Sequence, residues 1–208
     1  MITAGPTREA IDPVRYISNH STGKMGFAIA RALMNAGCEV NLVCGPVSIP
    51  TPEVSRIVPV VTAEEMNDSC LALFPKMDIA ILSAAVADYK CREVSTEKIK
   101  KKSDDLSIEL TRNPDIAFNL GKIKKKNQLV VGFALETENE KEHARKKLKE
   151  KNFDLIVLNS LKTEGAGFGH DTNKISIFDK NNNHKEFGLK SKNEVAEDIV
   201  NEIIQRLG

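Results

Sequence analysis

A run of polar residues followed by two glycines is the part of the sequence best suited to chemistry. Residues 19–22 (NHST) lie inside RYISNHSTGKMGFAIARAL, and Gly23 and Gly26 follow them. The second half of this stretch has the pattern of an amphipathic helix, and a short apolar run that breaks at Gly5 precedes it. A strand, a glycine turn and a glycine-started helix often bind phosphate, because backbone N–H groups and the helix dipole both favour an anion. We therefore expect an anion site whose loop contains Gly5, Gly23 and Gly26.

Packing and capping could explain part of this pattern without a ligand. The glycines could permit close contact between helix and strand, and Ser21 or Thr22 could be the helix N-cap. Close packing does not require a cluster of polar residues at one helix entrance, so the sequence favours the anion site. The P-loop version is excluded, because its GxxxxGK[ST] pattern would need glycine at Ser18 and serine or threonine at Met25.

An oxidoreductase that uses NAD(P) is the alternative enzyme class. Its fold needs a compact GxGxxG motif and an acidic residue near the end of the second strand. Here the glycines are dispersed, and the second predicted strand ends in VCGP, without a carboxylate. The Tyr-xxx-Lys pair of short-chain dehydrogenases is also missing, since His20 follows Tyr16 and Glu93 follows Tyr89 at that spacing. The sequence disfavours redox chemistry without excluding it.

The elements that must position this site alternate between strands and helices. Apolar, β-branched runs predict strands at residues 39–44, 57–61, 78–83, 129–134 and 154–158, after a short first strand at 1–4. Helical patterns occupy residues 26–35, 63–74, 114–126 and 138–151. The strands are nearly continuous in apolar residues, as expected when both faces are covered. This order predicts a three-layer α/β fold with a Rossmann-like, doubly wound and mostly parallel sheet.

The C-terminal part departs from this alternation. An alternating strand at residues 174–178 and a return strand near 186–189 predict a β-hairpin extension. Ser191 then begins the last helix, with Glu194 completing a capping box. Earlier in the chain, Pro59 predicts that its strand lies at a sheet edge.

The composition limits the cellular compartment and the classes of binding partner that we expect for the chain. Of its 208 residues 41% are hydrophobic and 28% charged, with a formal net charge of +1. This balance gives no general attraction to nucleic acid or acidic membranes, and no leader or membrane-spanning stretch is evident. The four cysteines form no CxxC pair and the four histidines have no ligand spacing. We expect a reduced, cytoplasmic setting and assign no metal ligands.

Five motifs, in order along nearly the whole chain, resemble those of phosphopantothenoylcysteine synthetase, the ligase of coenzyme A biosynthesis. They are AGPTREAIDPVRYISNHSTGKMG, AAVADY, EKIKKK, RNPDI and VVGFALET. The resemblance implies one ligase domain over residues 1–208 that forms a homodimer, with a flexible flap around residues 90–105. Bacterial members are often the C-terminal half of a fusion with a flavin-dependent decarboxylase. Such a fusion would explain why this sequence begins directly with a first strand of only four residues. It implies no flavin site in this chain.

The resemblance also implies a reaction. The family joins 4'-phosphopantothenate to L-cysteine, and most bacterial members consume CTP. The carboxylate attacks the α-phosphate, pyrophosphate leaves, and the amine of cysteine attacks the acyl-cytidylate and releases CMP. Polyanions must be held close, developing charge neutralised and the mixed anhydride kept from water. Mg²⁺ or Mn²⁺ is the expected companion of the triphosphate.

Two residues match catalytic positions of the family. Asn19 matches the asparagine that holds the acyl group, and an amide can donate to an oxygen without adding charge. Lys98, in EKIKKK, matches the catalytic lysine of the mobile flap, where a cation neutralises charge as the loop closes. A turn asparagine and a solvated lysine run are the alternative interpretations. The lysines at positions 100–102 have no counterpart in the motif.

The resemblance places the other site residues around the nucleotide. It implies nucleotide contacts for Ala84, Asp88, Lys98, Pro114, Asp115, Ile116, Ala117, Phe133, Lys147 and Lys151. Ala84 and Asp88 follow a predicted strand, and carboxyl ends of parallel strands form the usual ligand edge. Lys147 and Lys151 share one helix face, although cations also suit the C-terminal end of a helix dipole. Phe133 could equally pack in the core.

Overall fold

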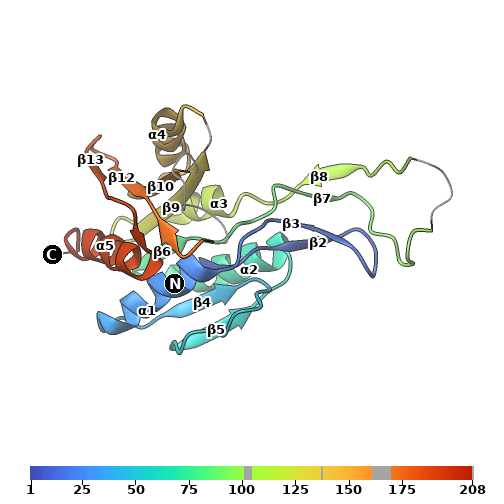
Figure 1. Cartoon of the computed structure of the whole chain (residues 1–208), viewed down its shortest axis with the longest axis horizontal. Helices are drawn as coiled ribbons and strands as arrows, with labels where there is room; N and C mark the ends of the chain where they lie inside the picture. Colours follow the sequence, from blue (N-terminus) through green and yellow to red (C-terminus); the bar gives the residue numbers. More distant parts are fainter. Residues whose placement is uncertain (101–104, 137, 161–169, 208) are drawn as a thin grey trace.

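A twisted sheet of eight strands forms the centre of the computed structural model, which describes residues 1–100, 105–136, 138–160 and 170–207 (Figure 1). In spatial order the strands are β13 (His184–Glu186), β12 (Ile175–Asp179), β10 (Leu155–Ser160), β9 (Leu129–Glu136), β6 (Ile79–Leu82), β1 (Ile2–Ala4), β4 (Asn41–Cys44) and β5 (Arg56–Pro59). All neighbouring pairs from β10 to β5 are parallel, whereas β12 and β13 add as an antiparallel hairpin. The predicted doubly wound sheet and its C-terminal hairpin are confirmed.

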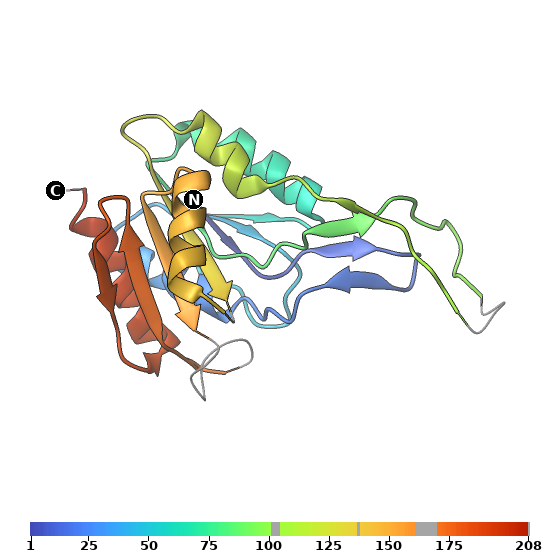
Figure 2. The ribbon, with the colours of Figure 1, turned by 90° about the horizontal axis from the view of Figure 1, so that it is seen from above.

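Helices cover both faces of this sheet. They are α1 (Lys24–Asn35), α2 (Ala63–Leu73), α3 (Ile116–Ile123), α4 (Glu140–Glu150) and α5 (Lys192–Ile204), with a 3₁₀ turn at Phe74–Lys76. One core cluster contains α1, α5 and the sheet side chains that face them, and a second contains α2, α3 and α4 (Figure 2). The predicted three layers are therefore confirmed. No helix within the described residues is long and apolar enough to cross a membrane.

The first strand is short yet lies in the middle of the sheet, between β4 and β6. Its three residues are all buried: Ile2 and Ala4 face the α1 layer, while Thr3 accepts a hydrogen bond from the backbone N of Ala84 at 3.1 Å. At the sheet edge, β5 contains Pro59, as predicted, because an edge strand does not need that N–H.

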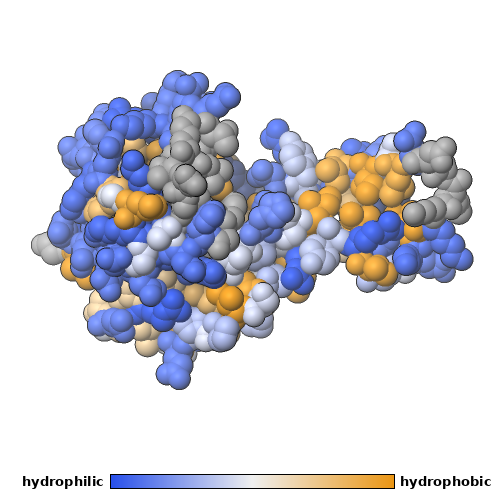
Figure 3. Space-filling view, viewed as in Figure 1, coloured by the Kyte–Doolittle hydropathy of each residue, from blue (hydrophilic) through white to orange (hydrophobic). Residues whose placement is uncertain are grey.

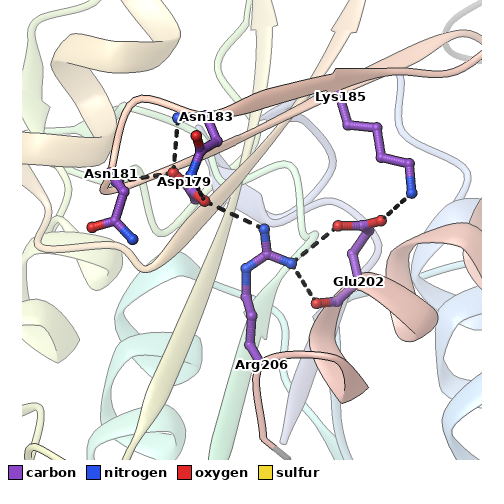
Figure 4. Close-up of polar contacts among 6 residues, drawn as sticks. All are labelled: Asp179, Asn181, Asn183, Lys185, Glu202 and Arg206. Atoms are coloured by element: carbon purple, nitrogen blue, oxygen red, sulfur yellow. Dashed lines mark hydrogen bonds and ion pairs between the residues drawn. The ribbon is translucent and has the colours of Figure 1, made fainter.

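The C-terminal helix and hairpin agree with the sequence pattern in kind but not in every boundary. Ser191 and Glu194 form the predicted capping box of α5. The return strand β13 ends where the sequence predicted it to begin, at Glu186. The turn is shorter than predicted. Asn182 adopts a left-handed conformation (φ 65°), and Oδ1 of Asp179 accepts hydrogen bonds from the backbone N–H groups of Asn181 and Asn183 (Figure 4).

Sequence patterns missed an arm that projects from the body (Figures 1 and 2). We use "the arm" for the described residues within 8–18 and 89–112, which contain two antiparallel ribbons: β2 (Arg8–Ala10) with β3 (Tyr16–Ser18), and β7 (Tyr89–Cys91) with β8 (Leu110–Arg112). Residues 89–91, which are in none of the strands predicted from the sequence, therefore form β7. These strands are three residues long and mix exposed with partly or fully buried residues, so they have no continuous apolar run to reveal them. The short pair β11 (Thr172–Asn173) and β14 (Lys190–Ser191) was missed for the same reason, and most of the glycine-rich segment 161–172 lies outside the described residues.

Replacing Gly26 with alanine is expected to destabilise the fold by about 1–2 kcal/mol. A Cβ atom at Gly26 would lie 2.5 Å from the Cβ of Ala4 in β1. Overpacking a core typically costs about 1–3 kcal/mol, which exceeds the roughly 1 kcal/mol that alanine gains over glycine in a helix. Urea unfolding measures the change, with Gly188→Ala as the control because an added Cβ there meets no atom within 4 Å. Equal midpoints for Gly26→Ala and the parent would contradict the close contact of α1 with β1.

Candidate nucleotide and acyl-group site

The candidate site lies where the direction of the sheet connections reverses. From β1 the chain passes through α1 to β4 on one side, and from β5 it returns through α2 to β6 on the other. In open α/β sheets the crevice beyond the carboxyl ends of such strands is the usual ligand position. Here those ends are joined, because the backbone N of Ala85 donates to the carbonyl of Gly5 at 3.0 Å and Pro6 forms a bridge with Ala85. Two cavities open at this junction.

The larger cavity has a volume of about 660 Å³. Ten of the residues that the sequence analysis assigned to the site line it: Asn19, Ala84, Asp88, Pro114, Asp115, Ile116, Ala117, Phe133, Lys147 and Lys151. They come from the end of β3, the segment after β6, the start of α3, the strand β9 and the C-terminal end of α4. Segments far apart in the sequence thus converge on one hollow of the size that nucleotides and similar ligands occupy.

Asn19 is positioned by the end of the β2–β3 ribbon. Its Nδ2 donates to the carbonyl oxygen of Ala85 at 2.9 Å, while the hydroxyl of the preceding Ser18 donates to the carbonyl of Thr7 at 2.7 Å. Ala85 lines both cavities. The detour between Gly5 and α1 therefore places an amide side chain at the boundary between the two cavities, where it can contact a group that spans them.

The smaller cavity, of about 170 Å³, lies at the N-terminal end of α1. Gly23 and Gly26 line it, whereas Gly5 lies behind the wall: a Cβ at Gly23 would be 3.5 Å from the Cα of Gly5. The predicted N-cap is wrong, because Gly23 takes that position in a left-handed conformation (φ 79°) and supplies no side-chain cap. The hydroxyl of Ser21 instead accepts from the backbone N of Gly23 at 3.4 Å. An N-terminus without a side-chain cap leaves N–H groups that suit an anion.

Cationic side chains surround this smaller cavity. Lys24 and Lys192 both line it. The ammonium of Lys24 pairs with Asp171 at 2.6 Å, and Lys192 is only 8% exposed. Burial, followed by the nearby charge of Lys24, lowers the pKa of Lys192 below its usual value. An anion in this cavity would stabilise both ammonium groups.

Lys151 and Asp115 form an ion pair at the wall of the larger cavity. Asp115 is also the N-cap of α3, since its Oδ1 accepts from the backbone N of Phe118 at 2.9 Å. The ammonium of Lys151 further lies 5.6 Å from the ring centre of Phe118. The family resemblance assigns both charged residues to the nucleotide, and nothing in the sequence indicates that they pair. A phosphate bound here would compete with the carboxylate of Asp115 for Lys151.

Asn113 was missed by the sequence analysis, although it lines the larger cavity. Its Nδ2 donates to the carbonyl of Ala87 at 2.8 Å, and its backbone N donates to the carbonyl of Asp88 at 2.9 Å. The hydroxyl of Thr7 accepts from the backbone N of Ala87 at 3.0 Å. Asn113 thereby joins the segments that carry Asp88 and Pro114. The RNPDI motif held the signal, because asparagine before proline often supports an irregular turn.

Lys98 is the one predicted catalytic residue that lies away from both cavities. It is exposed and lies beyond β7, in the segment of the arm that follows Cys91. Among the described residues it lines neither cavity. Lys100 is exposed as well, and the lysines at 101 and 102 lie outside the described residues. Within one chain, therefore, the structure does not bring Lys98 to Asn19.

The described residues hold no group of three or more histidine, cysteine or acidic side chains that could bind a metal ion. Two of the buried cysteines, Cys44 and Cys70, also lack the properties of a nucleophile. Burial raises the pKa of Cys44 to about 11 and that of Cys70 to about 12, so both remain protonated thiols near neutral pH. The site therefore consists of backbone N–H groups, amides, ammonium groups and a few carboxylates.

Known proteins resemble this chain over nearly its full length. A coenzyme A biosynthesis bifunctional protein CoaBC from Haemophilus influenzae is 51% identical over 205 residues, covering 99% of this chain and 51% of that protein. A cysteine/cysteine sulfinic acid decarboxylase of unknown prokaryotic origin is 54% identical over 204 residues, covering 98% of this chain and 57% of that protein. The chain thus spans about half the length of these relatives.

Solved structures agree with the fold. The crystal structure of the C-terminal domain of a CoaBC protein has a TM-score of 0.84 and 41% identity, and the match covers 99% of this chain and 93% of that one. A Cab2 mutant in complex with phosphopantothenate-cysteine shares the fold at a TM-score of 0.80 and 18% identity. The family model for the DNA/pantothenate metabolism flavoprotein C-terminal domain matches residues 1–207. The chain therefore belongs to the family of DNA/pantothenate metabolism flavoprotein C-terminal domains.

Proposed function

We propose that this chain joins 4'-phosphopantothenate to L-cysteine as one ligase domain over residues 1–208, with CTP as the energy source. The observation that supports this most strongly is the pair of cavities that meet at Ala84 and Ala85, with the amide of Asn19 at their boundary. A ligase that forms an acyl-nucleotide must hold an acyl group beside a nucleotide phosphate. The family membership and the CoaBC relatives point to the same reaction.

Each step of the reaction has a candidate group in the site. The nucleotide occupies the larger cavity, with Asp88 near its base or ribose and Lys147 and Lys151 near its phosphates. Asn19 holds the substrate carboxylate as its oxygen attacks the α-phosphate and pyrophosphate departs. The amine of cysteine then attacks the acyl carbon, loses a proton, and CMP leaves with the former carboxylate oxygen. The N-terminus of α1 supplies N–H groups for a phosphate of either substrate.

The divalent cation arrives with the substrate in this proposal. Among the described residues, no three histidine, cysteine or acidic side chains lie close enough together to bind a metal ion. The oxygens of a triphosphate, in contrast, bind Mg²⁺ or Mn²⁺ well. Among the carboxylates that line the larger cavity, Asp115 already pairs with Lys151, which leaves Asp88 as the residue best placed to assist the metal. The ion would neutralise phosphate charge during transfer.

The setting of the reaction follows from the same relatives. We propose that the full-length protein also carries a flavin-dependent decarboxylase, because the matched CoaBC proteins are about twice as long as this chain and are described as bifunctional. No flavin is assigned to residues 1–208. Coenzyme A precursors and CTP are metabolites of the cytoplasm, where we place the enzyme.

The arm supports a homodimer. It exposes apolar side chains that include Val94 (52%), Leu106 (56%) and Leu110 (43%), and Figure 3 shows hydrophobic surface on this projecting part of the molecule. Such a contiguous patch usually marks an interaction site. We propose that two arms pack together and bring Lys98, in the described part of the flap, to the cavities of the partner. This arrangement would explain why Lys98 lies far from the cavities of its own chain.

A double substitution, Leu106→Glu with Leu110→Glu, is expected to convert the dimer into a monomer. Each burial of a leucine contributes about 1.5–3 kcal/mol, and a charge in its place would be buried without a partner. Sedimentation velocity gives the mass, and the turnover of the monomer should fall at least about tenfold because the flap acts on the partner. Leu189→Glu is the control, since Leu189 is similarly exposed (48%) but lies outside the arm. If the parent protein sediments as a monomer and is fully active, the proposed homodimer is wrong.

The proposed function is tested by product formation from the purified chain. Phosphopantothenoylcysteine should form only when phosphopantothenate, cysteine, CTP and Mg²⁺ are all present, and CMP should appear in equal amount. A higher kcat/KM with ATP than with CTP would show that ATP is the preferred nucleotide, and the chain would still be a ligase of the same class. The alternative, an NAD(P)-dependent oxidoreductase, predicts instead that NADPH binds in a calorimetric titration and that no condensation product forms.

A further inference from the structure

A buried carboxylate in the turn between β2 and β3 makes more contacts than the turn requires. The side chain of Asp12 has no exposed surface. Its Oδ1 accepts from the backbone N of Val14 at 2.9 Å and of Arg15 at 2.8 Å, which closes the turn. Its Oδ2 accepts from Nε of Arg15 at 3.0 Å. The guanidinium of Arg15 holds the pKa of Asp12 far below its usual range, so the pair stays charged at any physiological pH.

The other partner of this pair is remote in the sequence. The backbone N of Ile99 donates to Oδ2 of Asp12 at 3.1 Å, and Nη2 of Arg15 donates to the carbonyl of Ile99 at 3.0 Å. A third bond runs from the backbone N of Ser95 to the carbonyl of Ile11 at 3.1 Å. Both ends of segment 95–99 are therefore bonded to the same turn, and Lys98 lies between those two ends.

Asp179 occupies a similar turn, but among the described residues its carboxylate accepts no hydrogen bond from the backbone of a remote segment such as 95–99, and it therefore serves as a comparison for Asp12. In the turn between β12 and β13, its Oδ1 accepts from the backbone N of Asn181 at 2.9 Å and of Asn183 at 3.0 Å (Figure 4). Its Oδ2 lies 3.5 Å from Nη2 of Arg206, and Arg206 also pairs with Glu202 of α5. The two turns share a carboxylate that accepts two backbone N–H groups and contacts an arginine. Only the Asp12 turn also binds a backbone amide of the flap.

We propose that Asp12 is a positioning residue for Lys98: it holds the backbone of Ile99, and so gives the neighbouring lysine a fixed point from which to enter the site. The proposal rests on the function proposed for Lys98. Hydrogen bonds to a charged carboxylate are stronger than neutral ones. A lysine side chain has several rotatable bonds, so fixing its backbone limits the positions that its ammonium must search. The anchor should therefore act on kcat more than on the KM for CTP.

Asp12→Asn tests the anchor while keeping the turn. An asparagine retains Oδ1 for the backbone N–H groups of Val14 and Arg15, but its NH₂ group faces the donors of Arg15 and Ile99 and cannot accept from them. The matched control is Asp179→Asn, which makes the same change in the β12–β13 turn. The fold of the body should survive the change, because neither core cluster contains a residue of the Asp12 turn. Thermal unfolding checks this for both variants.

Two measurements are made on each variant. Trypsin cleavage of the Lys98–Ile99 bond reports whether the segment is held, and it should be at least about tenfold faster in Asp12→Asn than in the parent or in Asp179→Asn. The kcat for ligation should fall about tenfold to a hundredfold in Asp12→Asn, with the KM for CTP changed less than about twofold. Cleavage and kcat that match the Asp179→Asn control would overturn the proposal. So would a fall in kcat without faster cleavage.

A double-mutant cycle separates positioning from a general effect. If Asp12 acts through Lys98, then adding Asp12→Asn to Lys98→Gln should lower kcat no further. A further tenfold loss in the double variant would show that Asp12 acts by another route and would overturn the proposal. A parent without any ligase turnover would instead overturn the function proposed for the chain and, with it, the role of Lys98. The cleavage assay would still show whether Asp12 holds the segment.

Discussion

Lys98→Gln is expected to lower the turnover of the ligase by about two to three orders of magnitude, the usual cost of losing one well-placed group that stabilises charge in the transition state. The oxygens of the transferring phosphoryl group and the departing pyrophosphate both carry negative charge in the transition state, and glutamine cannot neutralise it. The fold should be unaffected, because Lys98 is exposed. Single-turnover experiments that follow pyrophosphate and the final product separately would show which of the two half-reactions needs the ammonium.

The matched control for Lys98 is Lys100→Gln, since Lys100 is exposed in the same segment. A bystander in a solvated lysine run changes the rate very little, so this variant should behave as the parent. Equal rates for both variants would assign Lys98 to that run. Mixing Lys98→Gln chains with Asn19→Asp chains adds a geometric test, because a flap that reaches the partner leaves one intact site in each hybrid dimer. Activity in the mixture supports the arrangement across subunits, and inactivity contradicts it.

Asn19→Asp should be as damaging as the loss of Lys98, but for a different reason. The amide of Asn19 now donates to the carbonyl of Ala85 at the boundary between the cavities. An ionised aspartate cannot donate, and it would place a negative charge beside the carboxylate and the phosphate that must approach each other. We expect a loss of about two to three orders of magnitude in product formation. Rapid-quench measurement of the acyl-nucleotide would show the loss in the steps that make or use the anhydride.

Asn127→Asp provides the control for Asn19, because Asn127 is exposed in the loop before β9 and lines neither cavity. Its rate should equal that of the parent. Weaker binding of phosphopantothenate alone, with an unchanged rate at saturation, would limit Asn19 to ground-state binding. That result would contradict its role in the chemical steps.

The body of the fold was predictable because its signals are local and strong. Continuous apolar runs mark β4, β6, β9 and β10 as strands covered on both faces, and Ser191 with Glu194 marks the start of α5. The order of these elements then determines where the sheet connections reverse, and hence where Ala84 and Asp88 lie. Ten residues that the family resemblance assigned to the site line one cavity in the structure, because they lie at the ends of these elements.

The arm and its contacts were not predictable because they depend on long-range hydrogen bonds. The strands β2, β3, β7 and β8 have three residues each and no apolar periodicity of their own. The bonds from Ile99 to Asp12 and Arg15 join positions more than 80 residues apart. The N-cap of α1 was misjudged because Ser21 and Thr22 have the better capping chemistry. The N-cap is instead Gly23, in a left-handed conformation, where a Cβ would lie 2.8 Å from the side chain of Val47.

The transfer of oxygen from the substrate carboxylate to CMP shows whether an acyl-cytidylate forms. Phosphopantothenate labelled with ¹⁸O in its carboxylate is incubated with CTP, cysteine and this chain, and the products are analysed by mass spectrometry. If the carboxylate attacks the α-phosphate, one labelled oxygen must leave with CMP when the amine of cysteine displaces it. We therefore expect ¹⁸O in CMP and none in pyrophosphate or orthophosphate. Label in orthophosphate, or unlabelled CMP alongside the ligated product, would contradict an acyl-cytidylate.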